Sequence, residues 1–230
     1  MILSRVHEAL RFWWNFLGPL LLVTAPFALA GEAVQIWQGP ALQFNEQGVF
    51  QDVTTVSAVV LVLLQPFSAG ALIARLDALE HGVQRSLMEC IGVGVRVAPI
   101  LMLAYALMAV AVYVGLLMLI LPGIWAYIRL SLSSFLITLE GMTPLEAVQT
   151  SFERTAGSVQ WQLLLAWLFV VLLVFSVINL VGGAAQSALG DQPALDLGLG
   201  VLASLGGALI SVLVFRFYGL TRPSAPAGED

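Results

Sequence analysis

Arg129 has the clearest capacity for chemistry, because it is a cation within a long apolar stretch of this 230-residue chain. If a helix begins near Ile124, a rise of about 1.5 Å per residue places Arg129 about 9 Å inside a membrane-crossing segment. A guanidinium near the centre of such a helix costs roughly 3 kcal/mol, so it should face protein or water. The same half of the bilayer is expected to hold the other members of this candidate intramembrane polar site, which are Tyr113, Asn179 and Asp196.

Two interpretations of Arg129 are open from the sequence. In the functional one, the guanidinium binds an anionic lipid or solute group, or relays charge. In the structural one, it pairs with Asp196 or extends its charged end toward the outer interface. Replacing Arg129 with leucine separates them: folded protein without its role indicates function, and loss of folded protein indicates structure.

The remaining residue patterns predict no reaction. His7 and His81 have no third ligand at metal-binding spacing. The pair Gly92-x-Gly94 lacks the strand–turn–helix context of a phosphate loop. Cys90 is the only cysteine, which excludes an intrachain disulfide and a cysteine-rich metal cluster. We expect no catalytic residue, no metal and no cofactor, and therefore a protein that is not an enzyme.

Composition indicates that the chain lies in a membrane. Hydrophobic residues make up 60% of the sequence and charged residues 10%, whereas a soluble domain is roughly half apolar and a quarter charged. The net charge of −5 and the lack of a basic stripe exclude nucleic acid as a partner.

Charge-free stretches of bilayer length predict an all-α polytopic bundle of six transmembrane helices. About 20 apolar residues cross a hydrocarbon core of roughly 30 Å. The stretch 97–128 is too long for one span, and Pro122-Gly123 suits a tight outer turn that divides it. A Gly-Gly loop is expected after the fifth span. Residues 1–220 are predicted as one membrane domain and 221–230 as a short disordered cytoplasmic tail, with spans at about 12–31, 53–74, 97–121, 124–139, 160–180 and 197–217.

The arginines predict the orientation, because short cytoplasmic loops are enriched in basic residues. Placing the N-terminus inside leaves the outer segments 31–52, 121–123 and 181–196 with acids but no arginine. Both termini are then cytoplasmic. Apart from Arg129, every basic residue falls on the inner side; these are Arg5, Arg11, Arg75, Arg85, Arg96, Arg154, Arg216 and Arg222.

The first thirty residues allow a second interpretation. Arg5 and Arg11, an apolar run and Ala28-Leu29-Ala30 together resemble a cleavable signal peptide. The apolar run is long for a signal peptide and contains bulky tryptophans and prolines. We therefore expect the first helix to be retained, while cleavage would leave the direction of the other spans unchanged.

Two cytoplasmic connectors carry amphipathic stripes, which predict helices in the headgroup plane or beneath the bundle. Capping boxes mark both connectors, at Ser86-x-x-Glu89 and at Thr143-x-x-Glu146. The first box falls within its stripe, so that connector can also be two short helices broken near Gly82. The apolar stripes are Leu76, Leu79, Val83, Leu87 and Ile91 in the first, and Leu145, Val148, Phe152, Ala156 and Val159 in the second.

Several of these segments resemble the YciC-type family of bacterial inner-membrane proteins. The likeness is most specific in Leu121-Pro122-Gly123-Ile124 and the following connector, which ends Phe152-Glu153-Arg154-Thr155. It extends to the opening segment 12–22 and the closing segment 212–220. The resemblance implies a six-span inner-membrane protein and brings no catalytic residues. Arg129 is not general to that family's pattern, and similar Pro-Gly-Ile segments occur in the membrane domains of some glycerophosphodiester phosphodiesterases.

The leading hypothesis is a structural or accessory protein of the cell envelope that engages lipid or a membrane partner. Its expected partners are the lipid bilayer and either a membrane protein or a second copy of the chain. The alternative is a small transporter or channel whose polar cavity lies near Arg129. An intramembrane enzyme is the least favoured class.

Overall fold

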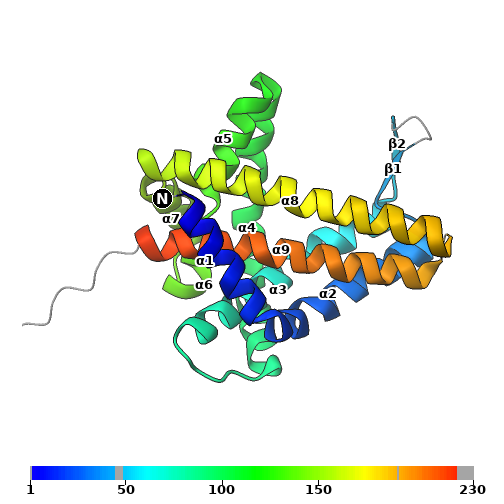
Figure 1. Ribbon diagram of the computed structural model, residues 1–230. Coiled ribbons are helices and arrows are strands. Elements are labelled where there is room, and N and C mark those ends of the chain that lie inside the picture. The colour runs from blue at the N-terminus through cyan, green and yellow to red at the C-terminus, as the bar shows by residue number, and fades with distance from the viewer. Residues whose placement is uncertain (1, 45–48, 191, 222–230) are drawn as a thin grey trace, which may run out of the picture.

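The computed structural model describes residues 2–44, 49–190 and 192–221 (Figure 1). Within these residues the chain forms helices and one short β-hairpin. The tail beyond Thr221, with Arg222, and the acids Glu46 and Asp191 lie outside the described residues. The elements are α1 (Ile2–Asn15), α2 (Leu17–Gln38), β1 (Leu42–Phe44), β2 (Phe50–Val53), α3 (Thr55–Glu80), α4 (Leu87–Met118), α5 (Ile120–Leu130), α6 (Ser133–Glu140), α7 (Pro144–Arg154), α8 (Ser158–Leu189) and α9 (Pro193–Thr221).

Six helical segments in the described part of the chain are long and apolar enough to cross a membrane. They are α2, α3, α4, α5 with α6, α8 and α9. This confirms the predicted class, an all-α polytopic helix bundle. α8 and α9 run side by side along the molecule, while the α4–α5 hairpin projects from it (Figure 1).

The N-terminal region differs from the predicted first span. The span begins at Leu17, and a separate amphipathic helix, α1, precedes it with a break at Phe16. α1 buries Val6, Ala9 and Phe12 against the bundle, and the Trp13 indole donates a hydrogen bond of 2.9 Å to the Leu205 carbonyl of α9. Apolar residues three apart carried this signal, but the charges among them obscured it.

The turn of the α4–α5 hairpin, predicted as an outer turn, also lies elsewhere than predicted. Helix α4 ends at Met118, Leu119 is extended (φ −171°, ψ 158°), and α5 starts at Ile120. Pro122 therefore lies in the first turn of a helix, where its missing N–H costs nothing, rather than in the turn itself. Gly123 instead permits close packing, because a Cβ on Gly115 would lie 2.8 Å from the Gly123 Cα.

The two predicted connectors have different structures. The second is the separate helix α7, which begins at Pro144 with its predicted capping box. The first is not a separate helix: α3 continues to Glu80, and α4 begins after the Ser86–Glu89 box. The predicted break is real, since Gly82 has a φ of +65° that favours glycine. The apolar residues of the first predicted stripe therefore belong to the end of α3, the loop after it and the start of α4.

The opposite end of the molecule holds further differences from the sequence prediction. The segment after α2 contains an antiparallel β-hairpin in which Leu42 pairs with Val53. Helix α8 continues through the predicted Gly-Gly loop to Leu189. α9 packs against α8 there, and a Cβ on Gly182 would make only an ordinary contact, of 3.6 Å, with the Leu199 side chain.

Candidate functional site

Arg129 is buried between aromatic side chains near the end of α5. Its side chain is 8% exposed, and its guanidinium carbon lies 3.8 Å from the ring centre of Phe152 in α7 and 5.4 Å from that of Trp125. The guanidinium also donates a 3.4 Å hydrogen bond to the Gln160 amide oxygen in α8. Its Nε has no hydrogen-bond partner in the described part of the chain. Arg129 thus joins α5 to α7 by cation–π contact and to α8 by a hydrogen bond.

Buried hydroxyl groups fasten α7 to the break between α5 and α6. The Ser151 and Thr155 hydroxyls donate to the Arg129 carbonyl at 2.8 and 3.0 Å. The Ser151 oxygen also accepts from the backbone N–H of Leu132, at 3.2 Å. These bonds satisfy backbone groups that the helix break leaves without intrahelical partners.

The structure does not bring the predicted site residues together. Tyr113 is 63% exposed on α4, and the Asn179 amide is exposed and donates to the Phe175 carbonyl of its own helix. Asn179 lies 19 residues beyond the Arg129 partner Gln160 on α8, which is about 28 Å along the helix. Asp196, in the first turn of α9, lies near Glu32 of α2. The expected outer-half cluster around Arg129 is therefore wrong.

Arg129 lies instead beside α7, at the end of the molecule away from the β-hairpin (Figure 1). Placing the helix start at Ile124 and ignoring the later break led to the misplacement. Trp125 lies one turn earlier in α5, but the partners Phe152 and Gln160 are 23 and 31 residues later in the sequence. Nothing in the local pattern identifies these two. Arg129 therefore lies at the same end of the bundle as Arg154 and Arg216. It no longer stands apart from the other arginines, as the sequence had predicted.

An ion-pair network holds α6, α7 and α9 together at this end. The Arg154 guanidinium donates two hydrogen bonds to the Glu140 carboxylate, of 2.6 and 2.9 Å. The buried Tyr218 hydroxyl donates to the same carboxylate at 2.9 Å. The hydrogen bonds to Glu140 raise the pKa of Arg154 above its usual value, which keeps the pair charged.

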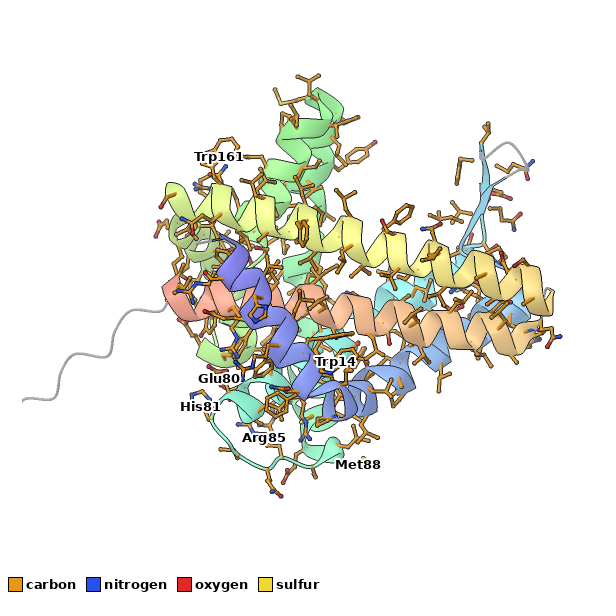
Figure 2. The ribbon with its side chains drawn as sticks, viewed as in Figure 1. Trp14, Glu80, His81, Arg85, Met88 and Trp161 are labelled. Carbon is orange, nitrogen blue, oxygen red and sulfur yellow. The ribbon has the colours of Figure 1, made fainter. Side chains whose placement is uncertain are left out.

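Further arginine contacts join the other helices there. Arg216 of α9 pairs with Glu80 of α3 at 3.0 Å and lies over the Phe12 ring of α1 at 4.5 Å. Arg75 donates to the Arg85 carbonyl across the α3–α4 loop. Glu80 and Arg85 lie at the end opposite the β-hairpin (Figure 2). The described arginine contacts therefore gather at one end of the bundle.

A leucine at Arg129 should lower the free energy of unfolding by about 2 kcal/mol. The change removes the cation–π contacts and leaves the buried Gln160 oxygen without its donor. Reversible unfolding in mixed micelles measures this effect. Arg96→Leu is the control, because Arg96 is exposed and has no partner among the described residues, so its change should stay within about 0.5 kcal/mol. A more stable Arg129→Leu protein would contradict a structural role.

The capping box of α7 predicts a pH dependence. Hydrogen bonds from the Thr143 hydroxyl and backbone N–H lower the pKa of Glu146 from its usual value. A lowered pKa stabilises the folded cap above the ordinary carboxyl pKa of about 4.3, and the contribution is lost as the pH falls through the folded value. Amide-exchange protection in the first turn of α7 should therefore decrease below about pH 4. In the Glu146→Gln variant, this amide-exchange protection should already be lower at neutral pH. It should show no further decrease as the pH falls below about 4.

A cavity of about 810 Å³ lies apart from Arg129, between α3, α4, α5–α6 and α9. Its lining is mostly apolar, and Val62, which is 70% exposed, places its opening on the outer surface of the bundle. Polar lining groups come from Gln65, Tyr105 and Tyr127, and from the serines Ser131, Ser134 and Ser211. Sequence analysis missed this cavity, although an uncharged amide in the middle of an apolar span was a signal for it.

The described residues contain no cluster of three or more His, Cys, Asp and Glu side chains that could hold a metal ion. The geometry as a whole defines a multi-pass integral membrane protein.

Comparison with known proteins adds bacterial relatives. The chain is similar to UPF0259 membrane proteins of Yersinia pestis (strain Pestoides F) and Yersinia pseudotuberculosis (strain YPIII). It is 25% identical to each over 181 residues, which cover 78% of this chain and 68% of each relative. No protein-family model and no solved structure matches. The likeness supports an uncharacterised bacterial membrane family, and the relatives' names state no activity.

Proposed function

We propose that this protein is a non-enzymatic accessory protein of the bacterial inner membrane that engages lipid headgroups at its cytoplasmic end. The supporting observation is the gathering of arginine contacts and two amphipathic helices, α1 and α7, at one end of the bundle. Basic groups favour the cytoplasmic side of an inner membrane, so both termini are cytoplasmic in this proposal.

The outward surfaces of α1 and α7 suit the headgroup region. On α1, Trp14 is 70% exposed beside the exposed Arg11. On α7, Leu145 is 59% exposed and Phe152, two turns later, is 39% exposed. Exposed apolar groups next to cations favour an interface with anionic lipid, where each nearby cation contributes about 1 kcal/mol.

We also infer kinship with the YciC-type group. The Yersinia relatives support membership in a bacterial membrane family, and the segment Leu121-Pro122-Gly123-Ile124 with its following connector supports the narrower assignment. We do not propose a transporter with a polar cavity at Arg129. That alternative requires Arg129, Asn179 and Asp196 to share one cavity, and the structure separates them.

Native mass spectrometry of the gently solubilised protein tests the lipid role. We expect bound anionic phospholipid on the wild type, reduced several-fold in a Trp14→Glu, Leu145→Glu variant, because each change places an anion in the headgroup contact. Val83→Glu is the matched control, since Val83 is also exposed but lies in the α3–α4 loop, outside both amphipathic helices. Equal lipid retention in the wild type and the double variant would overturn the proposal.

A further inference from the structure

The cavity between α3, α4, α5–α6 and α9 is large enough for a ligand. Its volume of about 810 Å³ falls within the range of roughly 300–1,000 Å³ that is typical of small-molecule sites. Four spanning segments form its walls, and the helix break at Ser131 lies within one of them. Apolar side chains dominate the lining, and the cavity opens on a surface that faces hydrocarbon in a membrane.

The polar groups in this cavity lie at mid-membrane depth. Gln65 is the eleventh residue of the 26-residue helix α3, so it lies about 15 Å from Thr55, near the centre of a hydrocarbon core of roughly 30 Å. Tyr127 comes from α5, on another wall of the cavity. A polar side chain at this depth is costly unless it finds a hydrogen-bond partner.

Two of these polar side chains have no such partner in the described part of the chain. Gln65 and Tyr127 make no side-chain hydrogen bond there, although the Tyr127 ring lies 5.3 Å from that of Trp167. By contrast, the Ser131 hydroxyl donates to the Ile128 carbonyl, and the Ser211 hydroxyl donates to the Gly207 carbonyl of its own helix. The cavity therefore presents an unpaired amide and an unpaired phenol, and each can donate a hydrogen bond.

The lining excludes a charged ligand head. None of the residues lining the cavity is acidic or basic. A phosphate at this depth would lose its hydration without gaining a counterion, which is strongly unfavourable. A carbonyl or hydroxyl oxygen would instead accept hydrogen bonds from Gln65 and Tyr127, while an attached hydrocarbon chain would fill the apolar remainder.

We propose that this cavity binds a neutral lipid whose carbonyl or hydroxyl oxygen lies near the middle of the bilayer. Two sources carry this chemistry: a diacylglycerol with its esters and free hydroxyl, and a quinone with its ring carbonyls. The site is separate from the headgroup contacts of α1 and α7, so it does not depend on the accessory role or on the orientation of the chain.

Native mass spectrometry with added lipid tests the site. The purified protein is titrated separately with dioleoylglycerol, decylubiquinone and dioleoylphosphatidylglycerol. We expect one molecule of a neutral probe to bind, with the two neutral probes distinguishing the ester from the quinone source. A Gln65→Leu, Tyr127→Phe variant should bind that probe about ten-fold more weakly, as the loss of two hydrogen bonds predicts.

Two further variants make the outcome specific. Ala109→Phe leaves both polar groups in place but fills the cavity, so it should also abolish binding of the neutral probe. Asn179→Leu is the control, because it removes an exposed amide that is hydrogen-bonded only within α8. This variant should bind the neutral probe with the affinity of the wild type. Circular dichroism confirms folding. Wild-type affinity in both cavity variants, or preferential binding of the charged phosphatidylglycerol, would overturn the proposal.

Discussion

Replacing Gly94 with alanine is expected to destabilise the bundle by about 3 kcal/mol, because α3 and α4 pack backbone to backbone there. A Cβ on Gly94 would lie 2.5 Å from the Phe67 carbonyl oxygen and 2.9 Å from the Ala71 nitrogen. Both are main-chain atoms, so no side-chain rotation relieves the overlap. The two helices must separate, which also loosens the facing contact of Gly70 with Val97.

Gly92→Ala provides the matched control in the same helix. A Cβ at Gly92 meets nothing within 4 Å, so alanine should be neutral or stabilise α4 by up to about 1 kcal/mol through its higher helix propensity. Reversible unfolding of both variants in mixed micelles gives the comparison. Similar stabilities for Gly92→Ala and Gly94→Ala would contradict the close α3–α4 packing.

Glu140→Gln is the second variant with a large expected effect, a loss of about 2 kcal/mol in the free energy of unfolding. The change removes the carboxylate that accepts from both Arg154 and Tyr218, and it leaves the Arg154 cation without its counterion. The side chains of Arg154 and Glu140 are 15% and 19% exposed, so solvent screens the pair only in part. This partial screening is why the expected loss is below that for a fully buried pair.

The Arg216–Glu80 pair supplies the comparison for this prediction. Glu80 is 39% exposed, so Glu80→Gln should cost less than about 1 kcal/mol. The same unfolding measurement applies to both variants. If the two changes cost the same, the Glu140 network does not fasten α6, α7 and α9 in the way that its geometry indicates.

The sequence predicted the spans because bilayer length and charge act locally along the chain. Six apolar segments, the capping box at Thr143 and the break at Gly82 each depend on residues only a few positions apart. The error at the α4–α5 hairpin has a local cause as well. Pro122 suits both a turn and the first turn of a helix, and only the Gly115–Gly123 contact decides between them.

The candidate site was less predictable, because it depends on contacts between distant segments. The sequence marks Arg129 as a cation in an apolar stretch that should face protein or water. Its partners Phe152 and Gln160 belong to helices whose packing the pattern does not specify. The cavity at Gln65 requires four spanning segments to meet, one of them at its helix break. Hydrophobic periodicity describes which face of a helix is apolar and not which neighbour covers it.

Side-selective labelling of single cysteines is the most direct test of the proposed orientation, in which the arginine-rich end faces the cytoplasm. In a Cys90→Ala background, one cysteine at a time replaces the exposed residues Val83, Leu145 and Gln51. An impermeant maleimide added outside spheroplasts should label only the cysteine at Gln51, in strand β2 of the β-hairpin, and should reach those at Val83 and Leu145 only after lysis. Labelling at Val83 or Leu145 in intact spheroplasts would contradict the orientation.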